Sequence, residues 1–160
     1  MRFTSQVRYA VYAVFDMAYH DAGMPHQVKT ISRRQGISPR YLEQIFQRLL
    51  RGGLLHSRRG PKGGYTLARA AKDISIGDLV RATEGSLEAL LNERPRAADR
   101  RARAHVGAPA AGRMGGTEVW GSVTARVAEL LDGITVEDLV HEAERRGLAR
   151  ESSAPHMYFI

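Results

Sequence analysis

Side chains able to read DNA bases gather in one short stretch of this sequence. Between Pro39 and Arg51, apolar residues at helical spacing form one stripe: Leu42, Ile45, Phe46, Leu49 and Leu50. Outside that stripe stand amide, guanidinium, phenol and carboxylate groups: Arg40, Tyr41, Glu43, Gln44, Gln47, Arg48 and Arg51. Such groups reach base edges when a helix enters the major groove of DNA. Glu43 is a candidate for specificity rather than affinity, because phosphates repel a carboxylate unless it accepts a hydrogen bond, for instance from cytosine N4.

A second group of cations follows in a turn rich in Gly and Pro. Arg58 ends the stretch before the turn, and the turn contains Arg59 and Lys62 together with Gly60, Pro61, Gly63 and Gly64. Small residues at a hairpin tip let the backbone approach phosphates, and an arginine beside them suits a narrow minor groove. Simpler roles stay open: Ser38 as a helix cap, Gly63-Gly64 as a turn requirement, and Arg58-Arg59 as a solvated pair.

The predicted elements place these side chains in a winged helix-turn-helix. A buried helix over 7–18 precedes a short helix over 30–35, a tight turn at 36–38 and a helix over 39–51. Gly36 ends one helix, and Ser38 with Pro39 begins the next. Two short strands then flank the Gly- and Pro-rich turn. We expect a mainly α fold with a small β-hairpin wing, and a DNA-binding domain over residues 1–85.

Positive charge is concentrated in the first part of the chain, which has 160 residues and a formal net charge of +7. Residues 1–66 hold 11 Lys and Arg against 3 Asp and Glu, whereas residues 67–160 hold 13 against 14. The asymmetry favours a nucleic-acid partner, although a solvated basic face without any partner also explains the charge alone.

The residue types exclude several kinds of chemistry. Cysteine is absent from the sequence, which excludes disulfides, thiolate nucleophiles and Cys-ligated zinc or iron–sulfur clusters. No P-loop, Gly-x-Ser-x-Gly motif or metal-spaced His cluster is present, so we expect no enzyme. The apolar runs fall short of the roughly 18 residues of a membrane span, and the chain begins with no signal peptide. We therefore expect a cytoplasmic protein without membrane contact.

Several motifs together resemble the Rrf2 family of bacterial winged-helix transcription regulators. The similar stretches are 8–10, 35–46, 53–55 and 59–68, and the resemblance covers residues 1 to about 85 and resumes over 120–140. It implies a dimer whose two recognition helices enter successive major grooves of a pseudo-palindromic operator. It also implies that Ser38, Arg40, Tyr41 and Glu43 face bases and phosphates, while Arg59, Gly60 and Pro61 enter the minor groove. The full predicted DNA-binding set is Thr4, Arg33, Ser38, Arg40, Tyr41, Glu43, Gln44, Arg58, Arg59, Gly60, Pro61, Lys62 and Gly63.

The second half of the chain predicts two capped helices and one longer helix. Ser75 and Thr135 each stand three residues before an Asp and ahead of an apolar stripe, the pattern of an N-cap with an acidic first turn. Between them, residues 117–131 carry a stripe that ends at Asp132-Gly133. This stripe can pack on its own chain, but the resemblance makes it a long C-terminal dimerisation helix within region 117–150. The predicted interface residues are Trp120, Val123, Val127, Leu130 and Leu131. The run 142–150 continues a charged helix, and a frayed tail over 151–160 follows.

Residues 86–116 are predicted to form a flexible loop. Cluster-binding members of the resembled family hold iron and sulfur through three cysteines of this loop, and the corresponding positions here are Ala102, Ala108 and Met114. We therefore expect no iron–sulfur cluster, no metal site and no other cofactor, and we interpret His105 as an ordinary loop residue. An engineered cysteine-free variant of a cluster protein gives the same sequence pattern, and that alternative stays open.

The function predicted from these features is a sequence-specific DNA-binding transcription regulator. We expect a homodimeric repressor that binds a pseudo-palindromic operator in double-stranded DNA without a cluster. The alternative is a winged helix that binds an acidic protein partner through its basic face. Binding of an effector or of a further protein partner stays open as well.

Overall fold

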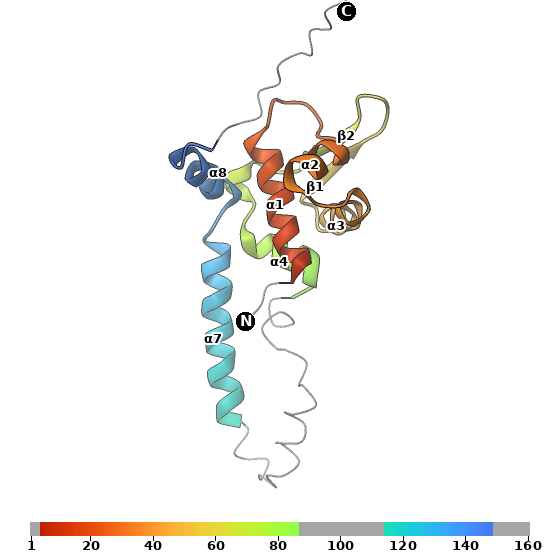
Figure 1. The fold of residues 1–160 in the computed structure, drawn as a ribbon. Helices are drawn as coiled ribbons and strands as arrows, with labels where there is room; N and C mark the ends of the chain where they lie inside the picture. Colours follow the sequence, from red (N-terminus) through yellow and green to blue (C-terminus); the bar gives the residue numbers. More distant parts are fainter. Residues whose placement is uncertain (1–3, 87–113, 149–160) are drawn as a thin grey trace, which may run out of the picture.

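The computed structural model describes residues 4–86 and 114–148. Its winged-helix part, here called the head, contains the first four helices, a hairpin and one 3-10 turn (Figure 1). These elements are α1 Ser5–Tyr19, α2 Val28–Gln35, α3 Pro39–Arg51, β1 Leu55–Arg58, β2 Gly64–Leu67, η1 Ala71–Asp73 and α4 Ile76–Glu84. Helix α7, Met114–Asp132, extends away from the head, and α8, Val136–Arg145, returns to pack beside α1. The predicted class, mainly α with a two-stranded antiparallel hairpin, is confirmed.

The hydrophobic core lies between α1, α3 and α4. Four residues of the predicted stripe on α3 are buried, namely Leu42, Ile45, Phe46 and Leu49. They pack in one cluster with Val14 and Met17 of α1 and Leu79 of α4. Because one face of α3 is used for this burial, its opposite polar face is directed outward.

The helix-turn-helix boundaries follow from local capping chemistry. Gly36 adopts the left-handed conformation with φ 65° and ends α2, and Ser38 accepts a hydrogen bond from the Tyr41 N–H at 3.3 Å. Pro39 occupies the first turn of α3, where a missing N–H costs nothing. The predicted boundaries of α3, 39–51, are those of the structure.

Asp16 fixes the angle between α1 and α2. Its carboxylate is completely buried and accepts from Arg34 Nε at 3.0 Å, from Arg34 Nη2, and from Gln35 Nε2 at 2.8 Å. Arg34 and Gln35 are the last two residues of α2. The pairing therefore sets the position from which the chain turns into α3.

A pair of backbone hydrogen bonds anchors the hairpin to the loop before α2. The His26 N–H donates to the Tyr65 carbonyl at 2.8 Å, and the Tyr65 N–H donates to the His26 carbonyl at 2.9 Å. A Cβ at Gly64, where φ is +154°, would lie 2.5 Å from the His26 carbonyl oxygen. Only glycine permits this close approach of the two backbones.

In the second half of the chain, the structure confirms both predicted capping patterns and contradicts three other expectations. Ser75 with Asp78, and Thr135 with Asp138, form reciprocal capping boxes at the starts of α4 and α8. The expected continuation of this charged helix through residues 142–150 is correct up to Arg145 and wrong beyond it, because α8 ends at Arg145 and Gly147 turns the chain with φ 65°. Helix α7 begins at Met114 rather than near residue 117. Met114 is therefore helical and does not belong to the predicted loop over 86–116. Leu131, predicted for dimerisation, is buried in the core of its own chain.

Two further expectations concern segments outside the described residues. The predicted loop lies there for the most part, together with Ala102, His105 and Ala108, and so does the tail over 151–160. Among the described helices, none has both the length and the apolar character needed to cross a membrane.

Candidate nucleic-acid interface

The outward face of α3 is the first part of the candidate interface. Arg40, Glu43 and Gln44 are exposed on this face, at the end of the helix that follows the tight turn. Ser38 is also exposed and serves as the N-cap, so the simpler role considered for it is present in the structure. The guanidinium, carboxylate and amide groups on this surface are those that pair with guanine, cytosine and adenine edges.

Tyr41 differs from its neighbours on α3. It is half-buried and packs against the core. Its ring lies edge-on to the ring of Tyr9, with centroids 5.7 Å apart and an interplanar angle of 88°. The aromatic pair fastens the first turn of α3 to α1, so Tyr41 supports the interface in addition to any contact with DNA.

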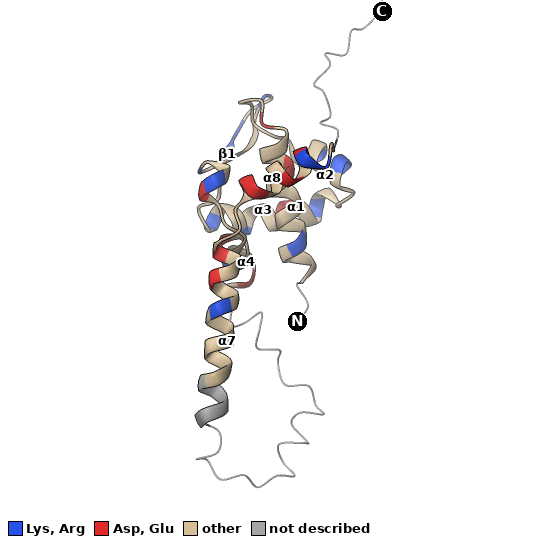
Figure 2. Ribbon diagram, turned by 90° about the vertical axis from the view of Figure 1, so that its left-hand side faces the viewer, with Lys and Arg blue, Asp and Glu red and all other residues tan. Residues whose placement is uncertain are grey.

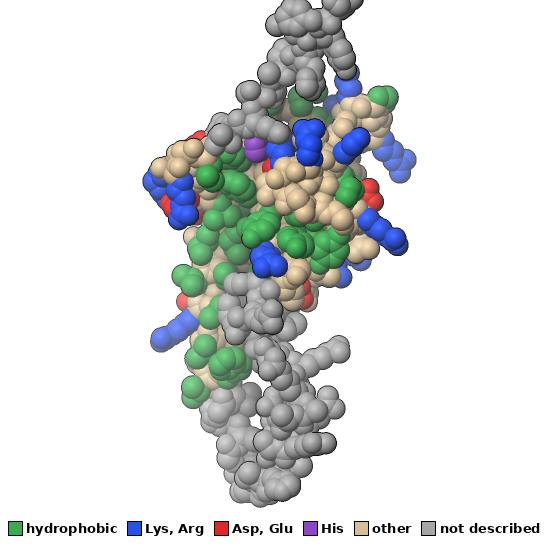
Figure 3. All heavy atoms as spheres, viewed as in Figure 1, with side chains coloured by type: hydrophobic (Ala, Val, Ile, Leu, Met, Phe, Trp, Pro, Cys, Tyr) green, Lys and Arg blue, Asp and Glu red, His purple; other side chains and the backbone are tan. Residues whose placement is uncertain are grey.

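The wing supplies the second part of the interface. Arg58, Arg59, Gly60, Pro61 and Lys62 are exposed at the end of the hairpin. Gly63 is half-buried, and a Cβ there would lie 2.2 Å from the Arg58 carbonyl oxygen, so the turn itself requires this glycine. Figure 2 marks Lys and Arg on the hairpin and on α2, and in Figure 3 cationic side chains project from the side of the head that carries α2, α3 and the wing.

Of the two remaining residues of the predicted DNA-binding set, Arg33 lies next to α3, whereas Thr4 lies at the α4 side of the head. Arg33 is exposed on α2, next to the turn into α3. Thr4 caps α1, accepting from the Val7 N–H at 3.3 Å and donating to the Glu84 carboxylate of α4. The structure therefore places Thr4 at the α4 side of the head, whereas the wing lies at the opposite end of α1 (Figure 1).

On α3 and the wing, Glu43 is the exposed carboxylate. Of the three acids in residues 1–66, Asp16 is buried against Arg34, and Asp21 lies in the loop after α1. Burial of the His26 imidazole, together with the nearby Arg34 guanidinium, lowers the pKa of His26, against smaller opposing effects of Asp21 and Asp16. The neutral imidazole is therefore favoured at the anchor of the wing.

Sequence reasoning missed three residues that position the interface: Tyr9, Asp16 and His26. Asp16 had a detectable signal, because a lone carboxylate stands between the apolar residues Phe15 and Met17 of a helix read as buried. Tyr9 lies in one of the stretches that carry the family resemblance, but neither a tyrosine on a helix nor a histidine in a loop by itself indicates a positioning role. Their roles depend on partners that only the fold brings close.

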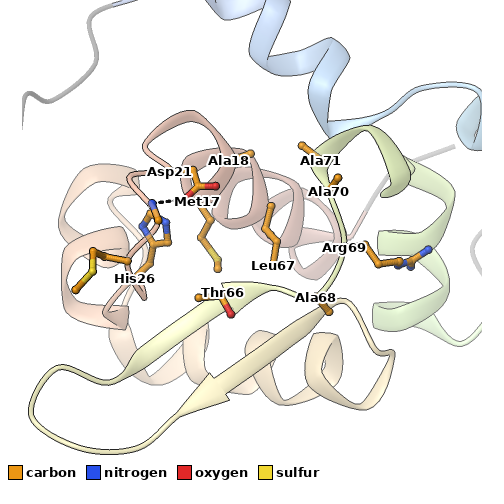
Figure 4. Close-up of a pocket in the computed structure, with 12 residues that line it drawn as sticks. Met17, Ala18, Asp21, His26, Thr66, Leu67, Ala68, Arg69, Ala70 and Ala71 are labelled. Atoms are coloured by element: carbon orange, nitrogen blue, oxygen red, sulfur yellow. Dashed lines mark hydrogen bonds between the residues drawn. The ribbon is translucent and has the colours of Figure 1, made fainter.

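A cavity of about 430 Å³ lies between the end of α1, the loop that follows it, strand β2 and the segment after β2. Asp21 and His26 stand at one end, Met17 and Leu67 point into it, and Arg69 at the other end turns its guanidinium toward α4 (Figure 4). Within the part of the chain that the structure describes, no three His, Cys, Asp or Glu side chains gather as a metal site would require.

The exposed apolar surface of α7 contains most of the predicted dimerisation residues. Trp120, Val123 and Leu130 are exposed, together with Val119, while Val127 is half-buried against the core. Leu131 faces the interior. One side of the predicted stripe therefore packs against the core of the same chain, and the other side is exposed to solvent.

Comparisons with known proteins agree with this architecture. The family profile "Rrf2: Iron-dependent Transcriptional regulator" matches residues 3–142. The HTH-type transcriptional regulator IscR of Pectobacterium carotovorum is 36% identical over 154 residues, which cover 96% of this chain and 88% of that protein. The structure of T. potens IscR aligns with a TM-score of 0.67 at 33% identity, covering 94% of this chain and 93% of the other. CymR, the global cysteine regulator of B. subtilis, aligns with a TM-score of 0.67 at 27% identity, covering 89% and 98%.

Proposed function

The chain belongs to the Rrf2 family of transcriptional regulators, which are not enzymes, and on this premise we propose that it is a homodimeric repressor of a pseudo-palindromic operator. In this proposal, residues 1–85 bind DNA and α7 joins two copies. Each α3 enters a major groove, and each wing follows the adjacent minor groove. Occupancy of the operator excludes the transcription machinery.

One observation carries the proposal: α3 and the wing present a cationic, hydrogen-bonding surface with a single exposed carboxylate. Arg40 and Gln44 supply donors for base edges, and Arg59 beside Gly60 and Pro61 supplies the narrow-groove contact. Glu43 selects among bases, because it tolerates a site only where a base donates to it.

Selection of bound fragments from genomic DNA tests the function, with the oligomeric state measured on the same sample. We expect one palindromic site to be enriched by a dimer. Arg59→Ala should weaken specific binding by about 1–3 kcal/mol. Glu43→Ala should instead broaden the set of enriched sites. Lys72→Ala is the control, since Lys72 is exposed on η1, which packs beside α8, and its loss removes the same positive charge.

Salt dependence separates this function from the alternative of an acidic protein partner. Release of counterions from phosphates makes affinity for DNA fall steeply with salt. Operator binding by Arg59→Ala at the level of the parent would refute the assigned reading surface. Undetectable DNA binding at low salt by a folded dimer would favour the protein-interaction function.

Regulation in this chain is proposed to operate without an iron–sulfur cluster, although the family profile is described as iron-dependent. The donor set does not fit the group, because no cysteine exists in the sequence to ligate iron. Protein supplied anaerobically with iron and sulfide should stay colourless and bind its operator as before. A stable visible absorption band with stoichiometric iron would contradict this expectation.

A further inference from the structure

The last residue of α7 is held against α4 by a two-armed ion pair. Asp132 Oδ1 accepts from Arg81 Nη2 at 2.7 Å, and Asp132 Oδ2 accepts from Arg81 Nη1 at 3.2 Å. The Ser75 hydroxyl, which caps α4, adds a longer contact to Asp132 Oδ1 at 3.4 Å. Two parallel guanidinium–carboxylate bonds restrict orientation as well as distance. We call this pair the Arg81–Asp132 clamp.

Gly77 makes room for the clamp. A Cβ at this position would lie 1.8 Å from Asp132 Oδ1, far inside van der Waals contact. Glycine in the first turn of a helix lowers helix stability relative to alanine. The carboxylate of Asp132 occupies the space that a side chain at position 77 would fill. The contact with Asp132 therefore explains why a glycine stands at this position.

The backbone on either side of the clamp is joined as well. The Ile76 N–H donates to the Ile134 carbonyl at 2.8 Å, and the Val136 N–H donates to the Ile74 carbonyl at 2.9 Å. Asp78 links the clamp to the exit of the wing, since it accepts from Arg81 at 3.1 Å and from Arg69 at 3.3 Å. The end of α7, the start of α4 and the segment after β2 thus form one joint.

Small rotations at this joint become large displacements along α7. The helix has 19 residues, which corresponds to about 28 Å at about 1.5 Å per residue. A tilt of about 10° at the joint moves the far end by about 5 Å. One base pair advances B-DNA by about 3.4 Å. Figures 1 and 2 show the lever, with α7 reaching away from the head and its acidic end next to α4.

We propose that the Arg81–Asp132 clamp is a positioning device that fixes the angle between α7 and the head and thereby sets the half-site spacing that the dimer accepts. This inference rests on the proposed function, because spacing has meaning only for two joined reading surfaces. It assigns to Gly77, Arg81 and Asp132 a role in specificity, although none of them belongs to the DNA-facing surface.

The test uses the full-length protein and a library in which two half-sites of the selected operator are separated by variable spacers. The parent should prefer one spacing by roughly tenfold, because a mis-spaced site must be twisted or bent to fit. Asp132→Asn should reduce that preference to roughly twofold. Affinity for a single half-site should stay unchanged, since the reading surface is intact.

Matched variants separate the clamp from general charge and stability effects. Glu129→Gln removes the same charge from an exposed position of α7 and should keep the parental spacing preference. Arg81→Gln and Gly77→Ala disturb the clamp from its other side and should broaden the spacing like Asp132→Asn. The Arg81→Gln/Asp132→Asn double variant should be no broader than either single variant, because both remove one interaction.

Each other outcome has a definite meaning. A parental spacing preference in Asp132→Asn, or an equal loss in Glu129→Gln, overturns the clamp as a spacing determinant. Dissociation of Asp132→Asn into monomers also overturns it, because the residue would then be needed for assembly. If the parent binds half-sites without any spacing preference, the proposed dimeric repressor fails, and the clamp inference fails with it.

Discussion

Asp16 shows how a single residue positions the reading surface without touching it. Its carboxylate is fully buried, and the Arg34 guanidinium and the Gln35 amide satisfy both oxygens. Burying a charge is costly unless its partners are close and well oriented, as they are here. Because Arg34 and Gln35 end α2, the ion pair transmits the position of α1 to the start of the turn before α3.

Asp16→Asn should destabilise the fold strongly. The variant leaves the Arg34 guanidinium, whose side chain is only 13% exposed, without its counter-charge. We expect the free energy of unfolding to fall by about 3–5 kcal/mol, measured as a lower urea midpoint with an unchanged slope. Asp21→Asn, an exposed carboxylate in the following loop, is the control and should have little effect. Equal midpoints for the two variants would show that the buried pair does not hold α1 and α2 together.

Residue faces were easier to predict from the sequence than residue partners. Helical spacing correctly assigned Leu42 and Phe46 to the inside of α3, and Arg40 and Glu43 to the outside. It placed Tyr41 outside as well, yet the ring is half-buried against Tyr9 because an aromatic side chain reaches across to the neighbouring helix. Periodicity describes one helix at a time and carries no information about the next.

At the scale of elements, predictions succeeded where capping residues encode a boundary. Ser38 with Pro39 fixes the start of α3, and the two Ser or Thr to Asp boxes fix the starts of α4 and α8. The end of α8 was misjudged because charged residues continue past it, while the left-handed Gly147 already turns the chain. A run of charge is compatible with a helix but does not define its end.

The wing is the element whose functional and structural requirements overlap most. Gly63 and Gly64 are required by close backbone approaches to Arg58 and His26. The same small residues keep the tip narrow beside exposed Arg59 and Lys62. The sequence alone does not separate these two reasons, because both favour glycine in the same turn.

At the scale of the whole molecule, the charge asymmetry of the sequence corresponds to two structural parts. The basic half forms α1, α2, α3 and the wing, while the near-neutral half contributes α4, α7 and α8. In contrast to the basic surface of the first half, α7 exposes an apolar surface, and Figure 3 shows hydrophobic side chains along this helix. Val119, Val123 and Leu130 are exposed there, an arrangement that burial against a second copy would stabilise. The sequence predicted one apolar stripe on this helix. That one side of the stripe packs in the core while the other side is exposed follows only from the packing of α7 against α4.

Val123→Glu should convert the proposed dimer into folded monomers. Val123 is 44% exposed, so the substitution leaves the core of the single chain intact, but it places a charge within the proposed interface. An unpaired charge buried between two helices should raise the dimer dissociation constant by about a hundredfold or more, measured by sedimentation across a concentration series. Ala125→Glu adds the same charge to an exposed position on the opposite side of α7 and should remain dimeric. Because one reading surface then binds alone, the monomer should retain weak half-site binding and lose the gain from a second half-site. Persistence of the Val123→Glu dimer at the parental concentration would place the interface on another surface.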